Sequence, residues 1–313
     1  MKETYRTFCN QAPSDFPVFM QHWFLDAVCA DGSWDAVVIE NGEGVQAVMP
    51  FFIKKKWAKN YVAMPTLCRF MGPYIIPAYR NNRNEISLLK KLLDQLPPLA
   101  SFEQDFNYTA QNWLPFYWKK FQQTTRYSYR ISLDDLDAVY QNMWPDYRNQ
   151  KIKKAGERVH IETGSDLGAF YRIHNLSFER QNLQPPFSFP FFEQLMQALE
   201  ANNAGKLFYA KDLESGELHA VACLVWDQNS AYFLLAGEDP ALRNSGAGIL
   251  LAWETIRYAA EELKLPWFDF AGSMIEPIAR VRKQFGATET PYLRVWKDRH
   301  WLWKMKRLVK KIW

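Results

Sequence analysis

Residues 231–248 read Ala-Tyr-Phe-Leu-Leu-Ala-Gly-Glu-Asp-Pro-Ala-Leu-Arg-Asn-Ser-Gly-Ala-Gly, and they join an apolar run to a glycine-containing turn. The apolar run predicts a buried strand. Apolar residues then recur at helical spacing from Ile249 to Leu263, which predicts an amphipathic helix. Glycine lets the backbone approach a ligand closely, and a helix start presents N–H groups to an anion. The stretch therefore predicts a strand–turn–helix unit that cradles a pyrophosphate.

The same turn also has a simpler interpretation, a helix start with Ser245 as its N-cap. The order of the neighbouring elements favours the binding interpretation. Before the turn we expect an antiparallel meander, and after it a strand, a short helix and a last strand. The expected meander strands are 207–209, 218–226 and 231–235, and the later elements are 267–272, 277–285 and 292–296.

The first half of the chain shows the same order of elements. The turn Asn41-Gly-Glu-Gly44 predicts a hairpin over 34–52. We then expect a helix, a strand, a short helix and a strand at 84–96, 101–108, 112–121 and 127–133. Residues match at an offset of 164, among them Lys119 with Lys283 and Phe121 with Phe285. The halves therefore indicate a duplication, in which only the second copy has the glycine turn. Between them we expect helices at 134–158, 167–182 and 190–202.

Composition limits the class of protein. The chain has 313 residues, 48% of them apolar and 23% charged, which suits one large or two ordinary folded domains. Its four cysteines, at positions 9, 29, 68 and 223, form no CxxC pair, so we expect reduced thiols, no metal site and a cytoplasmic protein. Neither a signal-peptide core nor an 18-residue apolar run is found, so we expect no membrane span.

The formal net charge of +4 is unevenly distributed, because residues 299–313 hold six basic residues and no acidic one. Within this tail an apolar stripe has helical spacing; its members are Trp301, Met305, Leu308, Val309 and Ile312. The pattern is typical of a helix lying on the inner face of a membrane. A terminal helix docked on the body would show the same pattern, and nucleic acid is a third and weaker alternative.

The Arg243-x-x-Gly246-x-Gly248 pattern resembles the acyl-CoA pyrophosphate loop of the GNAT acetyltransferase family. The duplication resembles FemAB-type transferases, which add amino acids to peptidoglycan precursors, and their acetyltransferase-like relatives. Further resemblances are the basic segment 147–155, Phe178-Glu-Arg-Gln, Phe268-Asp-Phe-Ala-Gly272 and Arg282-Lys-Gln-Phe-Gly286. The resemblance covers roughly residues 15–297. It implies an α/β (mixed α+β sheet) fold of tandem GNAT-like domains.

We expect a degenerate GNAT-like domain at 1–133, a donor-binding GNAT-like domain at 134–298 and the basic amphipathic tail at 299–313. FemAB enzymes that use aminoacyl-tRNA carry a long coiled coil in the second domain. No heptad-patterned insertion is found between Ile161 and Leu207, which favours an acyl-CoA or similar thioester donor.

The resemblance also implies site residues. Two parallel strands, 231–236 and 267–271, splay apart to admit the thioester, and backbone N–H groups there stabilise its oxyanion. The donor would be bound by Arg243, Asn244, Ser245, Gly246, Ala247 and Gly248. Lys283 is the candidate for stabilising charge, or else a solvated lysine, and Glu238 is a candidate base acting through water, or else a turn former. Asp269 is expected to cap a neighbouring loop.

Basic residues on other segments are candidates for binding the acceptor. Arg148, Lys151 and Lys154, with Lys153, would hold a phosphate or carboxylate, or would form a solvated helix face. Arg180 would line the acceptor site or make an internal salt bridge. We see no Ser-His-Asp, Cys-His or HExxH arrangement and expect no metal.

The sequence therefore predicts an N-acyltransferase that moves an acyl group from a CoA-type thioester to an amine. The acceptor would be a small molecule or a lipid-linked or cell-envelope precursor. Two alternatives remain open, an aminoacyl-tRNA-dependent peptidyl transferase and a non-catalytic binding protein on a GNAT scaffold.

Overall fold

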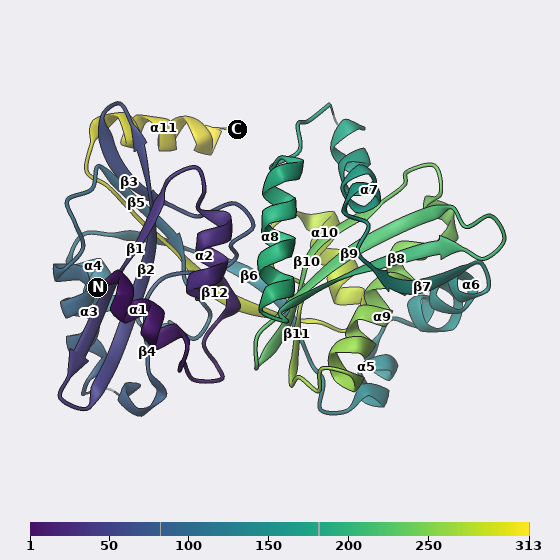
Figure 1. Ribbon diagram of the computed structural model, residues 1–313, viewed down its shortest axis with the longest axis horizontal. Coiled ribbons are helices and arrows are strands. Elements are labelled where there is room, and N and C mark those ends of the chain that lie inside the picture. Colours follow the sequence, from purple (N-terminus) through teal and green to yellow (C-terminus); the bar gives the residue numbers. More distant parts are fainter. Residues whose placement is uncertain (82, 181, 313) are drawn as a thin grey trace. The chain divides into compact units, whose positions relative to one another are not determined.

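The computed structural model describes residues 1–81, 83–180 and 182–312, with side chains as far as Arg307. Its contacts divide into two compact units. Unit 1 comprises Met1–Arg126 and the segment from Pro291 onward, and unit 2 is Tyr127–Thr290 (Figure 1). The predicted boundaries of the functional domains, 1–133, 134–298 and 299–313, stay a prediction.

Unit 1 builds a mainly antiparallel sheet in the order β1-β2-β3-β5-β12, with β4 paired to β2. Its strands are β1 (Ser33–Asn41), β2 (Gly44–Lys56), β3 (Lys59–Ala63), β4 (Tyr74–Ile75), β5 (Ser101–Asp105) and β12 (Thr288–Asp298). Its helices are α1 (Lys2–Cys9), α2 (His22–Val28), α3 (Glu85–Asp94), α4 (Leu114–Trp118) and α11 (Trp301–Ile312), with 3-10 turns η1 (Val18–Met20) and η2 (Pro77–Tyr79).

The predicted hairpin of unit 1 is confirmed. Asn41 faces Gly44 across the turn, and the Asn41 side chain accepts a hydrogen bond of 2.9 Å from the Glu43 N–H. Gly44 has a φ of +126°, a conformation that favours glycine. Leucines of α3 then pack on the sheet in one buried cluster with β1, β2 and β5.

Unit 2 builds a sheet in the order β6-β11-β10-β9-β8-β7. Its strands are β6 (Gln122–Ser132), β7 (Val159–Gly164), β8 (Gly205–Asp212), β9 (Leu218–Trp226), β10 (Ser230–Glu238) and β11 (Trp267–Asp269). Its helices are α5 (Leu136–Asn142), π-helical η3 (Tyr147–Lys151), α6 (Ile152–Gly156), α7 (Leu167–Glu179), α8 (Phe189–Ala201), 3-10 turn η4 (Arg243–Ser245), α9 (Ala247–Glu261) and α10 (Glu276–Gln284).

Strand β9 lies between two helical layers, which explains why every one of its residues is buried. Its even-numbered residues from Ala220 to Trp226 join the buried cluster built on α9. Its odd-numbered residues face α7 and α8, where Cys223 contacts Met196. On this second face Gly237 of β10 is required, because a Cβ there would lie 2.5 Å from the Cα of His174 in α7. Glycine at 237 therefore lets α7 lie directly on the strand.

The predicted repeat corresponds to matching elements. Shifted by 164 residues, α3, β5, α4 and β6 fall on α9, β11, α10 and β12. The last strand of each repeat pairs with a strand of the other repeat. β6 pairs with β11 over Arg130–Ser132, and β12 pairs with β5 over Arg294–Asp298. A bidentate ion pair between Arg294 and Asp105, with both bonds at 2.6 Å, supports the second pairing.

The prediction of one long helix over 134–158 is wrong. The chain is extended at Met143 (ψ 150°) and forms the separate helices α5, η3 and α6. Pro145 disfavours helical geometry in the residue before it, and this signal was overlooked. The strand β7, directly after these helices, was not predicted either. It pairs with β8 from Val159 to Gly164.

Within the part of the chain that the structure describes, no helix is both long and apolar enough to cross a bilayer. The four cysteines are all buried and unbridged.

Candidate functional site

The turn between β10 and α9 is shaped by Gly246. Its φ of +73° favours glycine, and it forms the N-cap of α9 directly after the 3-10 turn Arg243–Ser245. A Cβ at this position would lie 3.4 Å from the Cβ of Ala155 and 3.5 Å from the carbonyl oxygen of Lys151. The start of α9 therefore lies against η3 and α6, the segment that carries the basic cluster.

The N–H groups at this helix start already have partners. Ala247 donates to the Ser245 hydroxyl at 3.3 Å, and Gly248 donates to the Glu238 carboxylate at 3.4 Å. Both bonds are longer than the 2.9–3.0 Å typical of N–H···O bonds, so an anion with better geometry could replace them. Asn244 is exposed, while Ser245 and Ala247 are buried.

Glu238 supplies a negative charge at the helix N-terminus. One carboxylate oxygen accepts from Gly248, and the other lies 3.2 Å from Nε of Arg243. The Glu238 side chain is 25% exposed and that of Arg243 is 61% exposed. Burial raises the pKa of Glu238, against the opposing effects of Gly248 and Arg243. A carboxylate therefore occupies the position where the sequence predicts a phosphate.

The two parallel strands beside the turn pair over a short stretch. β10 pairs with β11 at only three positions, from Ser230 with Trp267 to Tyr232 with Asp269. Beyond Tyr232, β10 continues to Glu238 in contact with β9, with a register shift between Phe233 and Leu235. The parallel pairing therefore ends at Tyr232 and Asp269, and the entry of a thioester carbonyl beyond this point stays a prediction.

A buried polar cluster at the end of β11 is the feature that sequence reasoning underestimated. Asp269 is completely buried; it accepts hydrogen bonds from the Ser128 hydroxyl and from the Ala271 N–H at 2.7 Å. The Ala271 bond agrees with the expected loop cap. However, the second carboxylate oxygen has no partner among the described residues, and burial raises the Asp269 pKa. The positive charges of Arg130 and Arg282 act against burial and lower the Asp269 pKa.

Lys283 and Arg282 lie on α10 but have different surroundings. Lys283 is 52% exposed and pairs with Glu289 at 2.7 Å, and this partner raises its pKa. Arg282 lies 5.8 Å from the ring of Tyr129 and 5.9 Å from that of Phe270, beside the end of β11. Arg282, like Arg130 on β6, is thus a cation beside the end of β11, while the role of Lys283 stays a prediction.

The predicted acceptor-binding residues fall into two places. Arg148 donates to Gln141, Lys151 pairs with Asp146 at 2.8 Å, and Lys154 is exposed, all on the segment that packs against Gly246. Arg180 is exposed at the end of α7, a separate element. The structure therefore places the basic cluster beside the glycine turn, whereas Arg180 belongs to a different element. Among the described residues no group of His, Cys, Asp or Glu is arranged to hold a metal ion.

Comparison with known proteins identifies this unit. Residues 146–276, which lie within unit 2, match the family model described as acetyltransferase (GNAT) domain. Sequences of curated proteins give no match.

The chain is similar in structure to FemX, with a TM-score of 0.73 and 13% identity over 94% of this chain and 95% of that one. It is also similar to L-PGS from Bacillus licheniformis (TM-score 0.54, 12% identity, 94% and 91% covered). A third similar structure is the tandem GNAT protein from the clavulanic acid biosynthesis pathway, determined without AcCoA (TM-score 0.53, 12% identity, 85% and 83% covered). These similarities confirm the predicted tandem GNAT-like fold.

Proposed function

We propose that the protein is an N-acyltransferase that moves an acyl group from a CoA-type thioester to an amine. The observation that carries this proposal is the glycine turn at the start of α9, beside the point where β10 and β11 stop pairing. A turn of this kind binds phosphates through backbone N–H groups, and separated strands offer backbone donors to a carbonyl oxygen.

In this proposal the segment from Arg243 to Gly248 binds the donor pyrophosphate. The Arg243 side chain is 61% exposed, so a donor phosphate can reach its guanidinium and replace Glu238 as the partner. Lys151 and Lys154 lie on the segment beside Gly246, so they add positive charge for donor phosphates or for an acidic acceptor. Glu238 then leaves the Gly248 N–H and becomes available as a base.

The reaction is a direct transfer. The acceptor amine attacks the thioester carbonyl carbon, the new C–N bond forms, and the C–S bond breaks. The thiolate leaves with the electron pair and takes up a proton, while the amine loses one to Glu238 through water. Backbone N–H groups of β10 beyond Tyr232 stabilise the oxyanion, with Lys283 or Arg282 adding positive charge.

A cell-envelope or lipid-linked amine is the acceptor class we favour. The fold similarity to FemX supports it, because FemAB-type transferases modify peptidoglycan precursors. Such precursors carry phosphates, which suit Arg148, Lys151 and Arg180. Work on such an acceptor would take place at the cytoplasmic side of a membrane.

A second candidate is an aminoacyl-tRNA-dependent transferase of the FemAB type. The specific observation in its favour is the Glu238 carboxylate at the start of α9, because a resident anion opposes a donor pyrophosphate there. A scaffold that only binds ligands is the remaining alternative.

Isothermal titration with acetyl-CoA, a long-chain acyl-CoA and charged tRNA distinguishes these functions. CoA-ester binding in the micromolar range supports the proposal, charged tRNA binding alone supports the second candidate, and product formation separates an enzyme from a binding protein.

Gly248→Leu is the test variant, because Gly248 has ordinary helical geometry and its added Cβ would meet only the Glu238 carboxylate, 3.1 Å away. It should abolish CoA-ester binding without unfolding the turn. Gly42→Leu, on an exposed glycine of unit 1 with open space around it and no positive φ, is the control.

A further inference from the structure

The hairpin of β2 and β3 and the start of α11 form one aromatic surface in unit 1. Trp303 is buried, and its ring lies 5.1 Å from that of Trp57 at the hairpin tip and 5.7 Å from that of Tyr61. Arg307, one turn further along α11, pairs with Glu103 and Asp298. The tail helix is therefore docked on the body by one face. Figure 1 shows α11 in yellow beside this hairpin.

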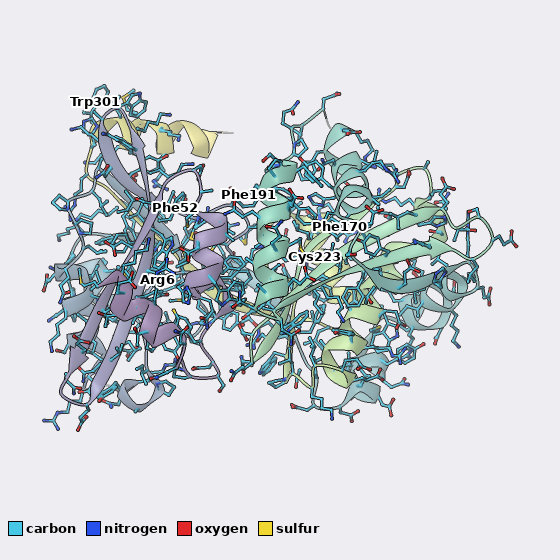
Figure 2. All side chains as sticks on the ribbon, viewed as in Figure 1. Arg6, Phe52, Phe170, Phe191, Cys223 and Trp301 are labelled. Atoms are coloured by element: carbon cyan, nitrogen blue, oxygen red, sulfur yellow. The ribbon has the colours of Figure 1, made fainter. Side chains whose placement is uncertain are left out.

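The opposite face of α11 and the hairpin tip leave large apolar side chains exposed. Trp301 is 60% exposed, Met305 is 55% exposed, and Trp57 is 51% exposed. Trp301 and Met305 are one helical turn apart, and Figure 2 shows Trp301 at the hairpin end of α11. Docking therefore does not account for Trp301 and Met305, two of the five members of the apolar stripe predicted from the sequence. The other three lie beyond Arg307, outside the described side chains.

Positive charge surrounds these side chains. Residues 54–61 and 299–307 contain basic residues and no acidic one. Lys54 and Arg307 are paired with carboxylates elsewhere in unit 1. Lys55, Lys59 and Lys304 are exposed and make no ion pair within the part of the chain that the structure describes.

A basic groove of about 610 Å³ continues this surface along α11. Its lining includes Lys120, Lys297, Arg299 and Lys304, with Asp298 as the acidic member, already bound by Arg307. Partial burial and the neighbouring cations Arg299 and Lys119 lower the pKa of Lys297. Because these cations lie close to one another, the groove favours the binding of an anionic group, and its volume suits one as large as a phospholipid headgroup.

We infer that Trp57, Trp301 and Met305, with the lysines around them, dock the protein on an anionic lipid bilayer. Tryptophan prefers the boundary between headgroups and acyl chains, and lysine is attracted to anionic headgroups. The exposed apolar side chains among these lysines favour a bilayer over RNA, because the RNA backbone is bound through its phosphate charges and offers no apolar layer. The surface is formed by the β2–β3 hairpin and by α11, so the tail by itself is only part of it.

The test is flotation of the full chain with vesicles of phosphatidylcholine alone and of an equal mixture with phosphatidylglycerol. We expect binding to the anionic vesicles only, weakened by salt. Trp57→Ser should reduce binding several-fold, and Lys55→Glu/Lys59→Glu should reduce it by about fivefold or more per lysine. Circular dichroism should show all variants folded.

Matched controls lie elsewhere in unit 1. Trp118 is 48% exposed, so Trp118→Ser removes an equally exposed tryptophan, and Lys90→Glu/Lys91→Glu makes the same charge change on α3. The inference is overturned if the wild-type chain ignores anionic vesicles, or if the controls lose as much binding as the test variants. Binding of tRNA, but not of vesicles, that depends on Lys55 and Lys59 would make this an RNA surface instead. None of these outcomes depends on acyl transfer, so the proposed reaction stands or fails separately.

Discussion

Replacing Glu238 with glutamine should tighten the binding of a CoA-type donor. The carboxylate lies 3.4 Å from the Gly248 nitrogen and 3.2 Å from Nε of Arg243, so it occupies the donors that a phosphate would use. Glutamine keeps the shape and an acceptor oxygen but removes the charge. The variant therefore separates the electrostatic repulsion between the carboxylate and a donor phosphate from steric blocking by the side chain.

The magnitude follows from the distance. A phosphate oxygen bound to the Gly248 N–H would come within about 4 Å of the carboxylate, where two unit charges interact by about 1 kcal/mol in water and about 4 kcal/mol at an effective dielectric constant of about 20. Glu238 is 25% exposed and can rotate away, so the lower part of this range applies. We expect about 1–2 kcal/mol, which is roughly a 5- to 30-fold lower Kd for acetyl-CoA.

The pH dependence gives the prediction a second readout. Because burial raises the pKa of Glu238, this carboxyl becomes neutral at a higher pH than an ordinary glutamate. Donor affinity of the wild-type protein should therefore approach that of Glu238→Gln as the pH falls through this pKa. Any change common to both proteins reports the titration of the donor phosphates instead.

The assay is calorimetric titration with acetyl-CoA, and Glu254→Gln is the control. Glu254 lies on α9, is 28% exposed and pairs with Arg257, so it matches Glu238 in exposure and in having an arginine partner. Unchanged or weaker binding by Glu238→Gln, with the fold intact, would refute the idea that this carboxylate competes with the donor. If Glu238 is also the base, the variant should bind tightly and turn over slowly.

The remaining predictions concern the fold and the charge near the separated strands. Gly237→Ala should destabilise unit 2 by about 3 kcal/mol, measured by urea denaturation, because its Cβ would overlap the His174 backbone; an unchanged midpoint would contradict that packing. Asp269 has a raised pKa, so the stability that its protonated form contributes is present at acid pH and is lost as the pH rises through that value. Asp269→Asn should remove this part of the pH dependence. Asp269→Ala should lower the stability of the fold by about 1–3 kcal/mol, because it leaves the Ser128 and Ala271 donors without a partner. The same dependence of stability on pH in the wild type and in Asp269→Asn would contradict a titrating Asp269. Lys283→Ala should lower kcat by about 10-fold or more if this lysine stabilises transition-state charge, and an effect confined to Arg282→Ala would transfer the role to Arg282.

Much of the fold could be predicted because local signals agreed with the final packing. The turn at Asn41–Gly44 fixed the first hairpin, and the periodicity after Gly248 fixed α9. The repeat predicted the matching order of elements in both units. The exchange of last strands between the two sequence repeats could not be predicted, because partner choice in a sheet depends on tertiary contacts such as the Arg294–Asp105 ion pair.

The failures also have physical causes. The turn between β2 and β3 has Trp57 and Ala58 with positive φ, and neither residue signals a turn. Pro145 accounts for the break in the helix predicted over 134–158. The π-helical turn that follows it has no recognisable sequence signature.

At the site, the sequence indicated the glycine turn and the parallel pairing of the strands beside it, since both depend on local composition and strand order. It could not show that Glu238 would lie on the Gly248 N–H, because a side-chain direction ten residues upstream is set by the folded turn. The complete burial of Asp269 was equally invisible, because it depends on Ser128 from a distant strand.

The most direct test of the central claim is the amide spectrum of the chain labelled with ¹⁵N-glycine, recorded while acetyl-CoA is added. The 14 glycines include Gly246 and Gly248 at the turn, and Gly42 and Gly216 in open loops as internal references. We predict that the signals of Gly246 and Gly248 shift most and saturate together, while those of Gly42 and Gly216 stay in place. Saturating acetyl-CoA that leaves Gly246 and Gly248 unmoved would contradict donor binding at this turn, and with it the proposed acyl transfer from CoA.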